Sequence, residues 1–310
     1  MLKNLLVIGL LYYLFIPCLL NAQDIRIFKV SDFELKGPVQ SCEVITDYGK
    51  EIFEFNEDGL LLTTTTQYND ADKDVTIYKY GGGHLLEKRL ESYKDNTLDL
   101  ATSMVYFYEI DSVGPLSIKE KVISLDKDFY EQQEYFYDAD GKLDKIMVSN
   151  ENGVDEIKIS YDNYKEEKTT SQFLNGILQK SIRVSNKKNK KGEVFRIELT
   201  KEFVDGDPLK AIEKRYDAND RIINEKLFKY DLQTEAFVQQ ESLNYAYDEM
   251  GVLSKIEVTR DKTVTVKNFI FQFDDGNPKN WVKKIITPDN TYTTRKIDYY
   301  FVPETENKPN

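Results

Sequence analysis

The chain has 310 residues, of which 42 are Lys or Arg and 54 are Asp or Glu, and its formal net charge at pH 7 is −12. Binding to a phosphate backbone needs a basic surface, so this acidic balance argues against nucleic acid as a partner. The single histidine, His84, leaves few ways to build a Ser-His, Cys-His or histidine-rich metal site. We therefore expect no metal, no cofactor and no enzymatic activity.

Residues 1–22 have the composition of a secretory signal peptide. Lys3 supplies a short positive start, an apolar run extends from Leu5 to Leu20, and Ala22 is a small residue suited to cleavage before Gln23. Cleavage there would leave a single domain over residues 23–302. The protein is thus predicted to be exported, either to the periplasm or to the extracellular side of an outer membrane, and to be soluble after cleavage with an association to the envelope.

Two alternatives remain open at this end of the chain. The apolar run approaches the roughly 17 residues of a spanning helix, so it could be retained as an anchor, although Pro17 fits a signal better. Acylation at Cys18 would make a lipoprotein, but the bulky residues before it argue against such a site. After removal of the signal, Cys42 is the only thiol, which rules out an intrachain disulfide.

A degenerate motif of two alternating aromatic residues, an acidic turn, glycine and leucine recurs along most of the chain. Its clearest copies are Tyr135–Leu143 and Tyr245–Leu253. The second aromatic residue returns about every 26 residues, the length of two strands and two turns, which indicates a stack of repeated units. Looser copies begin at Phe53, Tyr78, Tyr106, Ile159, Tyr216, Phe228 and Phe271.

The turn residues predict that each copy is a β-hairpin. Asp138 can accept a hydrogen bond from the backbone two residues further on, and Gly141 tolerates the positive φ that closes a type I turn with a bulge. Such a turn places Tyr137 opposite Leu143.

Strict alternation from that turn assigns side chains to the two faces of the sheet. Tyr135 and Leu143 should share one face, whereas Ile146 and Val148 should lie on the other. Both faces are then partly apolar, so the sheet must curl on itself, stack on a second sheet or dock against a partner.

The remaining signals also favour strands. Asn152-Gly153 and Asn175-Gly176 lie between alternating runs and predict further hairpins. No window shows the 3.6-residue spacing and caps of a helix, and 21 Tyr and 17 Phe suit strands. The chain is predicted to be all-β, with residues 303–310 as a disordered tail.

The aromatic-x-Tyr-Asp-x-x-Gly-x-Leu units resemble the YD repeats of the RHS family, from about Leu35 to Tyr300. The segments Leu35–Ser41 and Gly276–Lys284 resemble small exported RHS-like proteins of diderm bacteria, most of which have no assigned activity. Large members wind their repeats into a spiral β-sheet shell around a cargo. The resemblance therefore implies repeated antiparallel β-hairpins in a long curved or spiralling sheet. With about nine units and no appended effector domain, encapsulation of a cargo is not expected.

Two groups of residues are candidate ligand contacts. The only tryptophan, Trp281, and its neighbour Asn280 could form a surface contact, while the tyrosine ladder is better explained as core. A basic cluster in this acidic chain could dock an anionic lipid or glycan, although a solvated hairpin tip also explains it. The cluster consists of Lys187, Lys188, Lys190 and Lys191.

Other motifs have simpler explanations. The glycines before His84 could cradle a phosphate only if a helix followed, and residues 85–90 suggest a strand instead. The alternating acids of Asp70–Asp74 resemble calcium ligands but lack the later Glu of a complete loop. We expect a polar turn at each place.

The sequence thus predicts an exported cell-envelope binding or scaffold protein whose partner is an envelope protein or a polysaccharide. The alternative is a glycan-binding or glycan-cleaving protein with carboxylates on a concave sheet surface. An outer-membrane barrel is a third class, which needs a continuous apolar stripe on its lipid-facing side. Runs such as Ser117–Val122 place charge on both faces and argue against it.

Overall fold

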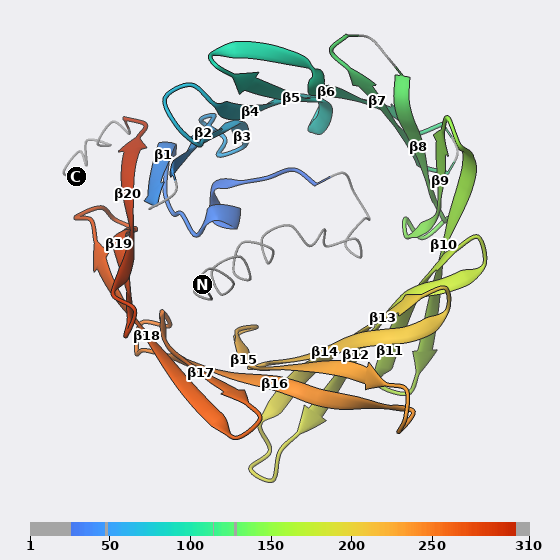
Figure 1. Cartoon of the computed structure of the whole chain (residues 1–310), viewed down its shortest axis with the longest axis vertical. Helices are drawn as coiled ribbons and strands as arrows, with labels where there is room; N and C mark the ends of the chain where they lie inside the picture. The colour runs from blue at the N-terminus through green and yellow to red at the C-terminus, as the bar shows by residue number, and fades with distance from the viewer. Residues whose placement is uncertain (1–25, 47–48, 114, 127–128, 302–310) are drawn as a thin grey trace, which may run out of the picture.

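The computed structural model describes residues 26–46, 49–113, 115–126 and 129–301. Twenty antiparallel strands form one closed barrel, in which each strand pairs with the next and β1 pairs with β20 (Figure 1). The strands are β1 (Val39–Thr46), β2 (Gly49–Phe55), β3 (Leu61–Gln67), β4 (Lys73–Gly81), β5 (His84–Lys94), β6 (Thr97–Asp111), β7 (Ser117–Ser124), β8 (Phe129–Tyr137), β9 (Leu143–Asn150), β10 (Gly153–Tyr164), β11 (Glu167–Leu174), β12 (Ile177–Lys188), β13 (Val194–Val204), β14 (Asp207–Tyr216), β15 (Ile222–Asp231), β16 (Ala236–Tyr247), β17 (Leu253–Arg260), β18 (Thr263–Phe273), β19 (Trp281–Thr287) and β20 (Thr291–Tyr299).

The sheet closes on itself, so the expectation of an open curved or spiralling sheet was wrong. The all-β composition and the repeated hairpins are confirmed, but β1 and β20 pair along most of their length instead of leaving two free edges. An even number of strands in simple succession brings the first and last strands together antiparallel. Their pairing satisfies backbone groups that open edges would expose.

Helical structure is nearly absent, as predicted. Within the described ranges, the single helical segment is η1, a 3-10 turn at Val30–Phe33 that lies inside the ring (Figure 1). None of the helical structure in the described part of the chain is long and apolar enough to cross a membrane. The predicted signal peptide and tail fall outside the described residues.

The repeated motif places its turns at one rim of the barrel. The turns that follow even-numbered strands lie at the rim where β1 starts and β20 ends, because strand directions alternate. We call this the entry rim. At the turn after β8, Asp138 Oδ1 accepts hydrogen bonds from the backbone N–H groups of Asp140 (2.9 Å) and Lys142 (2.8 Å), and Gly141 has φ 76°. Tyr137 pairs with Leu143, as predicted.

The predicted division of faces around this turn was wrong. Tyr135 pairs with Ile146 and Gln133 pairs with Val148, so Ile146 and Val148 share the face of Tyr135. The register shifts between Phe136 and the next residue. A bulge of this kind adds one residue to one strand, which reverses the parity of all residues beyond it.

Contacts inside the ring identify which face looks inward. Phe33 of η1 packs against Phe53 and Phe55 of β2, with ring centroids 4.6 and 5.5 Å apart. Directly paired residues of an antiparallel ladder share a face, and the pairing carries this assignment around the ring. The assignment agrees where the ring closes, because Cys42 of β1 pairs with the inward-facing Phe53 of β2 on one side and with the inward-facing Ile297 of β20 on the other. We call the two faces the inner wall and the outer wall.

The outer wall carries ion pairs at several places around the barrel. Strand β7 has charge on both walls, as expected, since Glu120 faces inward while Lys119 and Lys121 face outward. The outer-wall pairs are Glu43–Lys50 (3.5 Å), Lys79–Glu87 (2.8 Å), Lys119–Glu134 (3.3 Å), Glu213–Lys226 (3.5 Å) and Lys255–Glu257 (2.9 Å).

Candidate functional site

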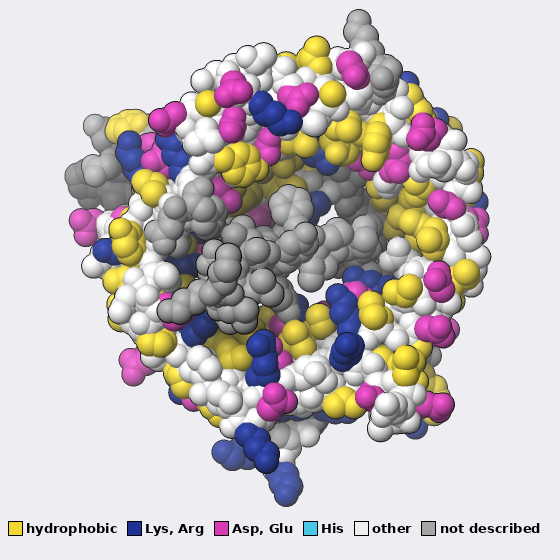
Figure 2. All heavy atoms as spheres, viewed as in Figure 1, with side chains coloured by type: hydrophobic (Ala, Val, Ile, Leu, Met, Phe, Trp, Pro, Cys, Tyr) yellow, Lys and Arg dark blue, Asp and Glu magenta, His cyan; other side chains and the backbone are white. Residues whose placement is uncertain are grey.

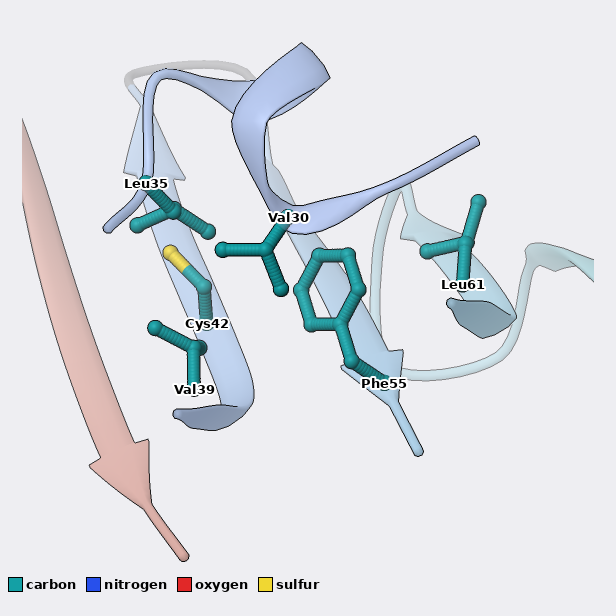
Figure 3. Close-up of a cluster of buried hydrophobic side chains, with 6 residues drawn as sticks. All are labelled: Val30, Leu35, Val39, Cys42, Phe55 and Leu61. Carbon is teal, nitrogen blue, oxygen red and sulfur yellow. The ribbon is translucent and has the colours of Figure 1, made fainter. Parts of the chain in front are cut away.

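The lumen of the barrel is partly occupied by the segment that precedes β1. Figure 3 shows six apolar side chains pointing toward one another between this segment and β1–β3. The backbone N–H of Val30 donates to the Gly59 carbonyl (3.0 Å), and that of Leu61 donates to the Phe28 carbonyl (3.0 Å). Burial raises the pKa of Cys42, a member of this cluster, to about 11. The cluster consists of Val30, Leu35, Val39, Cys42, Phe55 and Leu61.

Asn280, a predicted ligand contact, holds this segment against the barrel. Its side chain is buried, with 2% of its surface exposed. The Lys36 N–H donates to Asn280 Oδ1 (2.8 Å), while Asn280 Nδ2 donates to the Lys36 carbonyl (2.8 Å) and to the Tyr299 hydroxyl oxygen (2.8 Å). The Tyr299 hydroxyl in turn donates to Asp274. Both polar atoms of the amide are therefore used within the protein.

Trp281 has a similar role on β19. The Arg295 guanidinium lies 3.4 Å from the centroid of its ring, and the Trp281 Nε1–H donates to Glu34 (3.2 Å). Arg295 also donates to the Phe33 carbonyl (3.0 Å). These contacts fix the segment on the inner wall. The expected surface contact at Asn280 and Trp281 was wrong, because only 2% and 7% of these residues are exposed. Ligand binding by either residue stays a prediction.

The predicted basic cluster lies elsewhere, at the β12–β13 turn of the entry rim. Asn189 closes this turn by accepting from the backbone N–H groups of Lys191 (2.9 Å) and Glu193 (3.0 Å). The four lysines are exposed, and among the described residues none forms an ion pair. They lie on β12 and in the turn that follows it, and neither β12 nor β13 pairs with β19, so the structure does not join the two predicted groups.

A polar cluster on the inner wall was not found by sequence reasoning. The hydroxyls of Tyr108 and Tyr135 donate to the two carboxylate oxygens of Glu120, each at 2.9 Å. Burial, reinforced by the charge of Glu120, raises the pKa of both tyrosines. At neutral pH the tyrosines therefore act as hydrogen-bond donors. Only the register across β6, β7 and β8 reveals this cluster, because each of the three strands contributes one member.

A half-buried lysine, Lys88, lies close to the same cluster. Lys88 Nζ is 3.6 Å from the centroid of the Tyr106 ring. Burial lowers the pKa of Lys88, while the negative charge of Glu120 opposes that shift. A cation, a carboxylate and three phenol rings thus share one part of the inner wall.

The remaining motifs form turns. His84 begins β5 after a turn in which Gly82 and Gly83 have φ 59° and 81°, so no helix follows the glycines. Asp72 accepts hydrogen bonds from the Asn69 side chain (2.8 Å) and the Asp95 backbone (3.0 Å). In the part of the chain that the structure describes, no group of three His, Cys, Asp or Glu side chains is placed to hold a metal ion.

No protein-family model and no curated protein matches this chain. Solved structures that resemble it include a porin-like protein from Bacteroides vulgatus ATCC 8482, with 11% identity, coverage of 85% of this chain and 99% of that one, and a TM-score of 0.26. A protein of unknown function from Bacteroides fragilis NCTC 9343 has 12% identity, coverage of 58% and 94%, and a TM-score of 0.19. A Photorhabdus luminescens Tc holotoxin pore has 10% identity, coverage of 81% and 19%, and a TM-score of 0.19. At these scores the likenesses establish no shared function, and the resemblance to RHS proteins rests on the repeats alone.

Proposed function

We propose that this protein is an exported binding protein of the cell envelope and that its ligand enters the lumen of the barrel. The closure of twenty strands around a lumen is the observation that carries this proposal. Barrels of about eight strands are filled by their own side chains, whereas barrels of 16 or more enclose a channel or a plugged lumen. Figure 2 shows hydrophobic and Lys or Arg side chains along the inner side of the ring.

The charged residues of the outer wall favour a barrel whose outer surface faces water and not lipid. Charged side chains at the middle of a lipid-facing strand cost about 2–4 kcal/mol each for Lys or Arg. Ion pairs such as Glu43–Lys50 and Glu213–Lys226 occur on widely separated strands of the outer wall. This favours a protein that is dissolved within the envelope, and its function there is binding without catalysis.

Photo-crosslinking in cells tests the proposal. A photoreactive residue would replace an inner-wall residue, Thr170 or Thr200, and separately its outer-wall neighbour, Ser171 or Lys201, in the full-length chain with its own leader. Crosslinks to envelope protein or glycan from the inner positions, but not from the outer ones, are the expected result. Crosslinks from the outer wall alone would instead identify a scaffold that binds through its exterior and would overturn the proposal, as would no crosslink from either wall.

A further inference from the structure

Three lysines line a cavity at the entry rim. The cavity has a volume of about 420 Å³, within the roughly 300–1,000 Å³ of ligand pockets. Lys142 comes from the turn between β8 and β9, Lys165 from the turn between β10 and β11, and Lys168 from the start of β11. Tyr161 and Thr170, which pair directly across β10 and β11 on the inner wall, form its base.

The cavity is positively charged although the whole chain is acidic. Within the described ranges, no carboxylate lies within 4.0 Å of the ammonium groups of Lys142, Lys165 or Lys168. Glu166 is the one carboxylate that lines the cavity. Burial and the charges of Asp138 and Asp144 raise the pKa of Tyr161, so two further carboxylates lie near the cavity. Asp144 is paired with Lys158 at 2.6 Å, and Asp138 accepts hydrogen bonds from backbone N–H groups of its own turn. Anions are therefore attracted to this part of the wall.

Neutral groups in the cavity suit a saccharide. The Tyr161 hydroxyl donates to the Leu143 carbonyl (2.9 Å), which fixes the ring while 38% of the residue stays exposed. A tyrosine ring offers a flat apolar face on which a sugar ring can stack. Lys142 Nζ lies over one face of this ring, 5.7 Å from its centroid, so a sugar would stack on the other face with an ammonium group close by. The Thr170 hydroxyl and the Asn163 amide also line the cavity and can bond to sugar hydroxyls.

We propose that this cavity binds an acidic saccharide, one that carries a carboxylate or sulfate group. The anionic group contacts the three ammonium groups, and the sugar ring stacks on Tyr161. The inference rests on the proposed function of the lumen as a ligand site and names the class of ligand. Charge-assisted hydrogen bonds to lysine supply the affinity, so binding weakens as salt rises.

Calorimetric titration of the mature protein, starting at Gln23, tests this inference. The probes are tetragalacturonate for the carboxylate, a sulfated disaccharide for the sulfate, and maltotetraose as a neutral control. The double variant Lys165→Gln/Lys168→Gln should weaken binding of the acidic probe by about tenfold for each lysine removed. Lys168→Arg, which keeps the charge, should retain most of the affinity. Lys187→Gln/Lys190→Gln is the matched control, because it removes two lysines from another turn of the same rim.

The outcomes separate this inference from the proposed function. Equal binding of maltotetraose, loss of binding only in the Lys187→Gln/Lys190→Gln variant, or no binding of either acidic probe would each overturn the saccharide site. If Thr200 on the inner wall still gives face-specific crosslinks in cells, the lumen remains the ligand site and only the class of ligand is wrong. Circular dichroism and thermal unfolding of each variant confirm that the barrel is intact.

Discussion

The hydroxyl of Tyr161, near the end of β10, donates a 2.9 Å hydrogen bond to the carbonyl of Leu143, the first residue of β9. The same bond joins Tyr80 to Leu61 (2.7 Å) and Tyr247 to Ile222 (2.8 Å). In each case the acceptor is the first residue after a motif turn, next to a bulge in the ladder. A tyrosine at this position gives the carbonyl a donor that holds two neighbouring strands together.

Replacing Tyr161 with Phe should therefore destabilise the barrel by about 1 kcal/mol, the usual net contribution of one hydrogen bond. Tyr164→Phe is the control, because Tyr164 is 68% exposed and shows no hydroxyl hydrogen bond to the described residues. Urea unfolding followed by circular dichroism measures both variants. Equal effects of the two substitutions would show that the bond contributes nothing.

The acidic residue of the motif turn acts through its backbone hydrogen bonds. Asp138→Ala should cost about 1 kcal/mol, because Asp140 and Lys142 then lose an acceptor for their N–H groups. Asp138→Asn should cost much less, since Asn56 accepts from the Leu60 N–H (2.8 Å) at the same place in another turn. Urea midpoints compare the two variants, and a larger loss with Asn than with Ala would contradict this role.

The hydrogen bonds of Asn280 should contribute strongly to the stability of the fold, so a substitution there should be strongly destabilising. Asn280→Ala removes the side-chain amide that bonds to both the N–H and the carbonyl of Lys36, at a cost of about 2 kcal/mol, about 1 kcal/mol for each hydrogen bond lost. Trypsin should then cut faster after Lys36. Asn219→Ala, in an exposed turn of the same rim, is the control. If trypsin cuts after Lys36 at the same rate in Asn280→Ala as in the native protein, the amide does not hold the segment.

Glu225 on the inner wall makes stability depend on pH. Burial raises its pKa above the usual 4.5, Glu241 adds to that shift, and Lys214 at 3.9 Å opposes it. Because the folded state favours the protonated form, the contribution of Glu225 to stability is present below pH 4.5 and is lost as pH rises toward its folded pKa. Glu225→Gln should therefore gain stability relative to the native protein across that range.

Unfolding in urea at several pH values measures this difference. Lys214→Met should raise the pKa of Glu225 further and make the native pH dependence steeper. A stability difference between Glu225→Gln and the native protein that stays constant with pH would contradict the assignment.

Cys42 should be unreactive in the folded protein. Its side chain is fully buried and its pKa is about 11, so only about one thiol in a thousand is ionised at pH 8. In a shortened chain that begins at Gln23 and therefore lacks Cys18, reaction with a disulfide reagent should begin only as urea unfolds the barrel. Complete reaction of the native protein within minutes would show that β1 opens on its own.

Local patterns determined much of this fold. Alternating aromatic residues predicted the strands, and the Asp and Gly of each motif predicted the turns, because both depend on neighbours within about ten residues. The pairing of Tyr137 with Leu143 followed from the turn type alone. A pair of carboxylates placed for glycan cleavage, by contrast, would depend on distances across the lumen, and no short pattern encodes those.

The tertiary structure decided which face each strand buries and whether the sheet closes. The bulge after Phe136 put Ile146 on the same wall as Tyr135, and alternation could not predict it because one extra residue reverses every later side chain. Closure depends on β1 meeting β20, and Asn280 reaches Lys36 across 244 residues of sequence. These contacts form only because the bending of all twenty strands together brings β1 and β20 side by side. They therefore depend on the whole barrel, and a local stretch of sequence cannot predict them.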